Sequence, residues 1–145
     1  MITLNDAQNI IHATLEYARG ADLPPMTVAV LNAGGHLLAF AREDDSSLLR
    51  EKIARGKAMG ALNMGVDTRV LAARAETHPH FFASLMALAE GEVVPVAGGV
   101  LVRNAAGEVV GAVGVSGAVP DADEKCAITG IHSAGLAVSA GLSPL

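Results

Sequence analysis

Two hydrophobic periodicities alternate along this chain. Over Thr3–Arg19 the apolar side chains recur three and four positions apart, which predicts an amphipathic helix. Thr3 followed by Asp6 resembles the capping box with which many helices begin. Short apolar runs at Met26–Leu31 and His36–Arg42 then predict two strands, joined by a glycine-containing turn. The chain therefore opens with a helix and a β-hairpin.

The most regular stretch lies at residues 95–117. Strands are predicted at Val100–Arg103 and Glu108–Ser116, on either side of a turn at Asn104–Gly107. In the second of these strands one face is small, because it carries Val110, Ala112, Gly114 and Ser116. Such a face lets a helix, another subunit or a ligand approach the backbone closely.

Helical patterns fill the remaining segments. They predict helices at Leu48–Met64, Arg69–Ala75 and Pro79–Ala89, and a last helix over about Asp121–Ala140. The two hairpins have similar turns, since NAGGHLLA at 32–39 parallels NAAGEVVG at 104–111. This similarity indicates either an internal duplication or two uses of one turn chemistry.

Composition narrows the function classes. The length of 145 residues predicts a single domain, 1–145, and the 51% apolar content favours a homo-oligomer that buries surface between subunits. A net charge of −5 argues against nucleic-acid and anionic-membrane partners. The single cysteine, Cys126, excludes an intramolecular disulfide, and the N-terminus lacks the features of a secretion signal. We therefore expect a cytoplasmic protein.

Two cations stand at positions that suggest a site. Arg42 ends an apolar strand face, where it can hold a carboxylate or pair with Asp44 or Asp45 at the rim. Lys57 lies within an apolar helix stripe, where it either extends to water or faces a pocket as a partly desolvated amine.

Histidines and acids supply the other candidate groups. His12 falls on the polar face of the first helix, and His132 lies at the margin of a buried face. His78 and His80 flank a proline, without a third metal ligand nearby. Three acids stand at the start of the last helix: Asp121, Asp123 and Glu124. Their negative charges stabilise the helix N-terminus through its dipole, and one of them can also carry a proton. The sequence has no metal, P-loop, dinucleotide or serine-nucleophile motif, so no metal site is predicted.

Three segments carry a resemblance to a known family. They are AVLNAGGHLLAFAR at 29–42, LLREKIARGKA at 48–58, and VPVAGGVLVR, GEVVGAVGVSG and DADEKCA within 94–127. They resemble the GlcG/HbpS family, which includes the C-terminal domain of PduO-type proteins. The resemblance implies a profilin-like α/β (α+β) fold with a central antiparallel sheet of about five strands flanked by helices. It also implies homo-oligomers, and some members are described as haem-binding proteins.

Haem binding requires an axial ligand, and His12 and His36 are the two histidines that the resemblance places in the relevant regions. We expect the pocket between the ends of the hairpins and the helix at 48–64. Its expected ligand-binding residues are Arg42, Lys57, Gly98, Gly99, Ser116 and Gly117, with Asp123 or Glu124 closing it.

Two functions fit this pocket. The first is a binding protein for a small molecule, either haem or a small carboxylate. The second is a cofactor-independent catabolic enzyme of the tautomerase or deaminase type, acting on an unsaturated or oxo carboxylic acid. In the enzyme, Arg42 would anchor the carboxylate and Asp123 or Glu124 would move a proton. Binding is favoured, because no nucleophile–base pair is visible.

Overall fold

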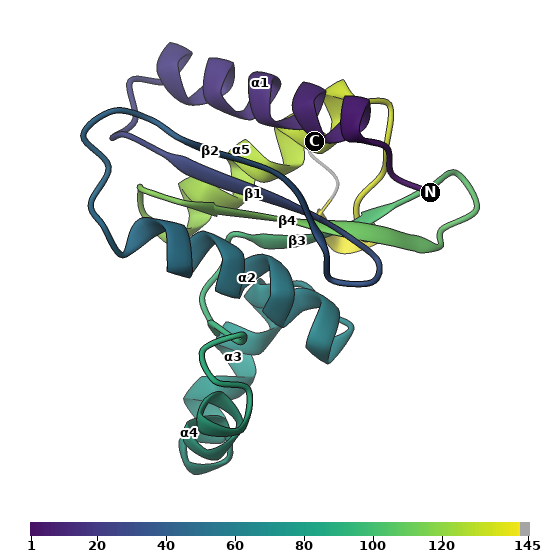
Figure 1. Cartoon of the computed structure of the whole chain (residues 1–145). Coiled ribbons are helices and arrows are strands. Elements are labelled where there is room, and N and C mark those ends of the chain that lie inside the picture. Colours follow the sequence, from purple (N-terminus) through teal and green to yellow (C-terminus); the bar gives the residue numbers. More distant parts are fainter. Residues whose placement is uncertain (143–145) are drawn as a thin grey trace.

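The computed structural model describes residues 1–142 (Figure 1). Five α-helices, four strands and a short 3₁₀ segment follow one another along this part of the chain. In order they are α1 (Leu4–Gly20), β1 (Thr27–Asn32), β2 (Leu37–Arg42), α2 (Arg50–Met64), α3 (Thr68–Thr77), α4 (Pro79–Leu88), β3 (Gly99–Arg103), β4 (Val109–Ser116), α5 (Pro120–Ser133) and η1 (Ala140–Leu142). None of these helices is long and apolar enough to cross a bilayer.

The strands form one antiparallel sheet in the order β2-β1-β4-β3. Helices α1 and α5 cover one face and pack against a core that includes Val28, Val30 and Val113, while α2 crosses the other face (Figure 1). The α+β class and the antiparallel sheet are confirmed. The expected number of strands is wrong, because the sheet described here has four.

The end of α5 explains the missing strand. The last helix ends at Ser133, well before the predicted Ala140, because Gly135 adopts a left-handed backbone with φ of 77°. The chain after it makes only an isolated bridge, between Ala137 and Arg103. Side chains from the start of α3 occupy the rest of the β3 edge, so a fifth strand has no place there.

The small face of β4 is covered by a helix. A side chain at Gly114 would collide with the backbone of α2 at Ala54 and Ala58, so glycine is required for this packing. The alternation of β4 changes at a bulge near Val110, which packs with the α1–α5 core, whereas Val109 packs on the α2 side. The close approach that the sequence predicts is therefore made by α2.

Helix α4 projects away from the sheet as an arm beyond α3 (Figure 1). It carries no Asp, Glu, Lys or Arg, and of its residues only Phe82 is buried. Leu88 at its end is 81% exposed. The arm thus presents apolar side chains to solvent.

The two hairpins share one turn. Asn32 Oδ1 accepts the backbone N–H groups of Gly34 and His36, and Asn104 Oδ1 accepts those of Ala106 and Glu108. The first strand of one hairpin lies inside the sheet and that of the other lies at its border. This difference in placement favours shared turn chemistry over duplication as the origin of the sequence similarity.

Candidate functional site

Lys57 and Asp123 form a buried ion pair between α2 and α5. Lys57 is 2% exposed and Asp123 is 1% exposed. Lys57 Nζ donates to Asp123 Oδ2 and to the Val115 carbonyl, both at 3.0 Å, and the Ala118 N–H donates to Asp123 Oδ1 at 2.8 Å. Lys57 therefore neither extends to water nor faces an open pocket, since its ammonium group is enclosed by protein acceptors.

Burial acts on both members of this pair. It lowers the pKa of Lys57 and raises the pKa of Asp123, because a desolvated site disfavours each charged form. The attraction between the two charges opposes both shifts. Gly98 makes room for the pair, because a side chain there would meet Lys57 Nζ.

The other polar groups expected to line this pocket already have protein partners. The Gly99 N–H donates to Thr68 Oγ1 at 2.8 Å, and Ser116 Oγ accepts from Arg50 at 3.0 Å. Gly117 packs against the backbone at Pro25, where a side chain would not fit. The region around Lys57 is therefore a packed polar junction, and its hydrogen-bonding groups face one another.

Glu124 belongs to a neighbouring cluster at the surface. Both of its oxygens accept from Arg69 Nε, at 2.9 and 3.0 Å, and Arg69 also donates to Asp121 at 2.6 Å. These two carboxylates raise the pKa of Arg69 above its ordinary value. Arg69 therefore fixes the start of α5 against α3.

Arg42 is held elsewhere. Its guanidinium donates to the carbonyls of Ser46, Ser47 and Leu48, at 2.9, 3.1 and 3.2 Å. Arg42 thus holds the loop that leads into α2. The sequence predicted either a carboxylate-binding role or a pair with Asp44 or Asp45, and the hydrogen bonds of Arg42 correspond to neither. Of the three residues expected to be catalytic, Asp123 and Glu124 lie on one helix, and Arg42 makes no hydrogen bond to either. The enzyme alternative therefore rests on the sequence alone.

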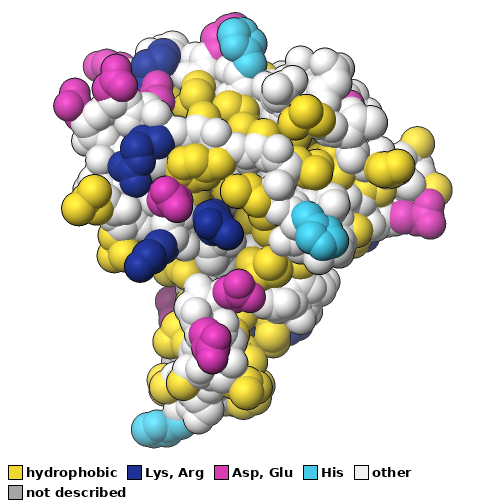
Figure 2. All heavy atoms as spheres, in the orientation of Figure 1, with side chains coloured by type: hydrophobic (Ala, Val, Ile, Leu, Met, Phe, Trp, Pro, Cys, Tyr) yellow, Lys and Arg dark blue, Asp and Glu magenta, His cyan; other side chains and the backbone are white. Residues whose placement is uncertain are grey.

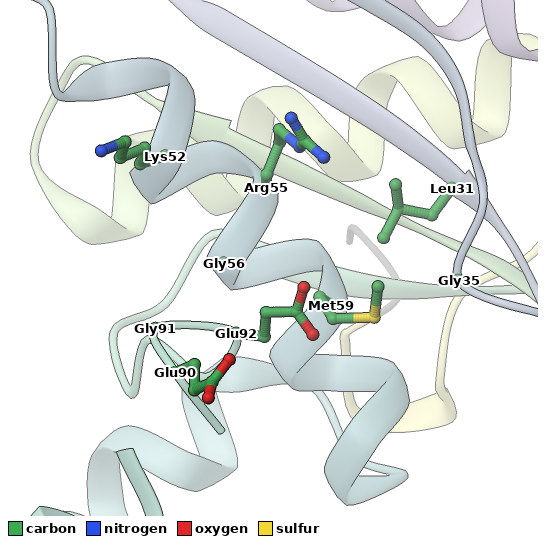
Figure 3. A pocket seen from close by; sticks show the side chains of 9 residues that line it. All are labelled: Leu31, Gly35, Lys52, Arg55, Gly56, Met59, Glu90, Gly91 and Glu92. Carbon is green, nitrogen blue, oxygen red and sulfur yellow. The ribbon is translucent and has the colours of Figure 1, made fainter. Parts of the chain in front are cut away.

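An open cavity lies beside the β1–β2 turn. Its volume is about 320 Å³, and it is lined by Leu31, Gly35, Lys52, Arg55, Gly56, Met59, Glu90, Gly91 and Glu92. Figure 3 shows the cations on α2, the acids on the segment that follows α4, and Met59 reaching toward Gly35. The volume is at the lower end of the range for small-molecule sites, about 300–1,000 Å³.

The lining of this cavity is amphipathic. Lys52 and Arg55 are exposed on one side, and within residues 1–142 the ion pair of Arg55 is a long contact of 3.9 Å with Glu51. Leu31 and Met59 supply apolar surface between them and the turn. In Figure 2, charged side chains of both signs surround exposed hydrophobic ones on this face of the molecule. Such a site suits a partly apolar ligand that carries carboxylates.

His36 lies at the turn that borders the cavity. Its ring Nδ1 is 3.2 Å from Asn32 Oδ1, which already accepts two backbone N–H groups. Met59 packs against the same turn, because a side chain at Gly35 would meet its sulfur at 3.2 Å. His12, by contrast, is on α1 with its side chain 81% exposed, and pairs with Glu16 at 3.3 Å. Neither of the two histidines expected to bind a cofactor is among the residues that line this cavity, but His36 directly follows Gly35, which does line it.

Comparison with known proteins places the chain in a family. The family model described as "Haem degrading protein HbpS-like" matches residues 2–132. The chain belongs to this HbpS-like family. It is similar to the solved structure of a double mutant of HbpS from Streptomyces reticuli, with 29% identity and a TM-score of 0.77 over 90% of this chain and 84% of that one. A comparison with curated proteins finds no match.

Two further structures share the fold of this HbpS-like protein. One is PduOC in complex with haem, with 24% identity and a TM-score of 0.84 over 93% of this chain and 96% of that one. The other is the protein ORFY of Klebsiella pneumoniae, with 24% identity and a TM-score of 0.84 over 92% and 90% of the two chains. At this identity the likeness establishes the fold.

Sequence reasoning missed the cations of the cavity and the role of Arg69. Lys52 and Arg55 are three positions apart on one helix, and this spacing places them on the same face. The sequence therefore did contain a signal for a pair of neighbouring cations. The acids on the opposite side of the cavity, Glu90 and Glu92, come from a segment without periodicity. No local sequence pattern therefore indicated that these acids and the cations of α2 line one cavity. Within residues 1–142, no group of three or more His, Cys, Asp or Glu side chains is arranged to hold a metal ion.

Proposed function

We propose that this HbpS-like protein binds haem at the cavity between the β1–β2 turn and α2, with His36 as the axial ligand. The hydrogen bond between the His36 ring and Asn32 carries the proposal. Because Asn32 Oδ1 accepts two backbone N–H groups, it acts as an acceptor, and the ring Nδ1 facing it must be the protonated nitrogen. Nε2 then holds the free lone pair that a metal ligand needs.

The residues around the cavity fit haem chemically. Imidazole and thioether groups are both axial ligands of haem iron, and His36 and Met59 lie against the same turn. Lys52 and Arg55 can pair with the two carboxylates of haem, while Leu31 and Met59 contact its apolar ring. Bound haem would supply a redox-active iron, and these side chains would hold and orient it.

The relatives support this choice of ligand. The family is described as haem degrading, and PduOC, which shares the fold, was crystallised with haem. A small carboxylate would use the same cations on α2 without needing His36. The two ligands are therefore separated by their dependence on the histidine.

Titration of the purified protein with haemin, followed by the Soret band, tests the proposal. His36→Ala is expected to weaken binding at least about tenfold and to shift the band, since the axial nitrogen is lost. His12→Ala is the matched control, because His12 is an exposed histidine that lies away from the cavity, on α1; its titration should equal that of the wild type. Asn32→Ala should weaken binding by freeing the ring, with the imidazole still present.

Two results decide against haem at this site. One is a Soret titration of His36→Ala that matches the wild type. The other is the absence of any Soret change with haemin, combined with thermal stabilisation by a dicarboxylate that is lost in Arg55→Gln. The second result would assign the cavity to a small carboxylate, which the cations on α2 alone can bind.

A further inference from the structure

The segment that follows α4 is packed directly onto α2. A side chain at Gly56 would meet the Gly91 carbonyl oxygen at 2.8 Å, so glycine at this position lets the segment approach the helix closely. Asn63 Nδ2, near the end of α2, donates to the Glu92 carbonyl at 3.0 Å. These contacts hold residues 90–92 against the helix that carries the two cations of the cavity.

Glu90 has a backbone conformation that its residue type does not favour. Its φ is 53°, in the left-handed region that glycine, asparagine and aspartate adopt more readily than glutamate. Within residues 1–142, the other non-glycine residues with a positive φ are both aspartates, Asp22 and Asp45. The Glu90 side chain is exposed, so core packing does not account for a glutamate here. A carboxylate at an unfavourable backbone position on a cavity wall indicates a role for its charge.

Charges of opposite sign lie on different walls of the cavity. The positive wall is formed by Lys52 and Arg55 on α2, and the negative wall is formed by Glu90 and Glu92 on the packed segment (Figure 3). All four side chains are exposed. Within residues 1–142, neither carboxylate of the negative wall takes part in an ion pair. Both negative charges are therefore free to act on a ligand that enters.

Building on the proposed function, we propose that Glu90 and Glu92 determine which tetrapyrroles the cavity accepts, namely those with carboxylates along one edge only. The two carboxylates of haem are on neighbouring pyrrole rings, and its opposite edge carries vinyl and methyl groups. Haem can therefore place its carboxylates at the positive wall and keep them away from the negative wall.

A tetrapyrrole with a carboxylate on every pyrrole ring, such as coproporphyrin, has no edge without charge. At least one of its carboxylates must approach the negative wall, where like charges repel. Because specificity is a difference between two affinities, this repulsion selects haem without strengthening the binding of haem itself. The two glutamates are thus specificity-determining residues of the site.

Titrations with haemin and with iron coproporphyrin III, followed by the Soret band, test the proposal. The measured quantity is the ratio of the two dissociation constants, and the wild type should bind haemin at least about tenfold more tightly. In Glu90→Gln/Glu92→Gln the ratio should move at least about tenfold in favour of coproporphyrin, because both charges are lost and the side-chain size is kept. Far-UV circular dichroism checks the fold of each variant.

Glu16→Gln/Glu76→Gln is the matched control. It changes the net charge by the same amount, at exposed glutamates on α1 and α3 that do not line this cavity. Its ratio should equal that of the wild type. An equal shift in the control and in Glu90→Gln/Glu92→Gln would overturn the proposal, because the net charge of the protein would then be sufficient to cause it.

His36→Ala separates charge selection from iron ligation. It removes the same ligand from both iron porphyrins, so it should weaken both and leave their ratio unchanged. Weaker binding in His36→Ala, with a ratio that Glu90→Gln/Glu92→Gln leaves unchanged, would overturn charge selection and retain the proposed function. A ratio that shifts as expected, with no effect of His36→Ala, would support charge selection and reject His36 as the ligand. No saturable binding of either porphyrin would overturn both.

Discussion

Removing one member of the Lys57–Asp123 pair leaves the other as an unpaired buried charge. The two changes to compare are Lys57→Met and Asp123→Asn, alone and combined. Methionine keeps the length of the lysine side chain, and asparagine keeps an acceptor for the Ala118 N–H. Each single change is therefore aimed at the charge, with little change in side-chain volume.

The geometry sets the expected size of the effect. At the Nζ–Oδ2 distance of 3.0 Å, the Coulomb attraction is about 5 kcal/mol for an effective dielectric constant of about 20. Breaking a buried pair at one end costs about 3–5 kcal/mol, a large part of the roughly 5–15 kcal/mol that stabilises a typical protein. The double variant contains neither charge, so it should lose clearly less than the sum of the single losses.

The two single variants should respond to pH in opposite ways. In Lys57→Met the remaining buried group is Asp123, whose pKa is raised in the folded state. The contribution of Asp123 to the free energy of unfolding is therefore fully present below its ordinary pKa of 3.8, and it is lost as the pH rises through the folded-state pKa. In Asp123→Asn the remaining buried group is Lys57, whose pKa is lowered in the folded state. The contribution of Lys57 to the free energy of unfolding is therefore fully present above its ordinary pKa of 10.5, and it is lost as the pH falls through the folded-state pKa. Relative to the wild type, the first variant should gain stability toward acid and the second toward alkali.

Urea unfolding followed by circular dichroism, at acid, neutral and alkaline pH, gives the free energies of unfolding. A cost of less than about 1 kcal/mol for either single change at neutral pH, the value typical of an exposed pair, would contradict a buried pair at this position. A loss in the double variant equal to the sum of the two single losses would also contradict it, since the two charges would then not interact.

Two further changes test the packing. Gly114→Ala should destabilise the fold by about 1–3 kcal/mol or more, because α2 leaves no room for a methyl group on β4. Gly20→Ala is the control for loss of glycine, because a methyl group there would meet nothing within 4 Å and its backbone is not left-handed. Equal effects of the two changes would contradict the packing argument. Cys126 should react with a thiol reagent at about pH 8 only on unfolding, because burial raises its pKa to about 11; rapid labelling of the folded protein would contradict its placement in the core.

Local features of the fold were predictable from the sequence. The capping box at Thr3 and Asp6 is formed as expected, with both reciprocal hydrogen bonds. The two hairpins lie where alternation and turn residues predict them, within one or two residues. These features depend on residues a few positions apart, so their physical causes are visible in a short window of sequence.

Long-range features were not predictable in the same way. Lys57 and Asp123 are 66 residues apart, and neither residue type indicates its partner. The cavity joins the β1–β2 turn to the segment at 90–92, which has no periodicity of its own. The end of α5 did have a local signal in Gly135, but the apolar residues after it continued the helical pattern and masked this signal.

The order of strands has a consequence for how the chain folds. Each hairpin closes over a short loop, but the centre of the sheet joins β1 to β4, with Thr27 opposite Ser116. Closing so long a loop costs entropy before the contacts form, which slows folding in proteins dominated by non-local pairs. Until that closure, the valine-rich inner borders of both hairpins are unpaired. Any conformation in which this closure has not yet occurred therefore exposes the most apolar strands of the chain, which are the segments most prone to aggregate.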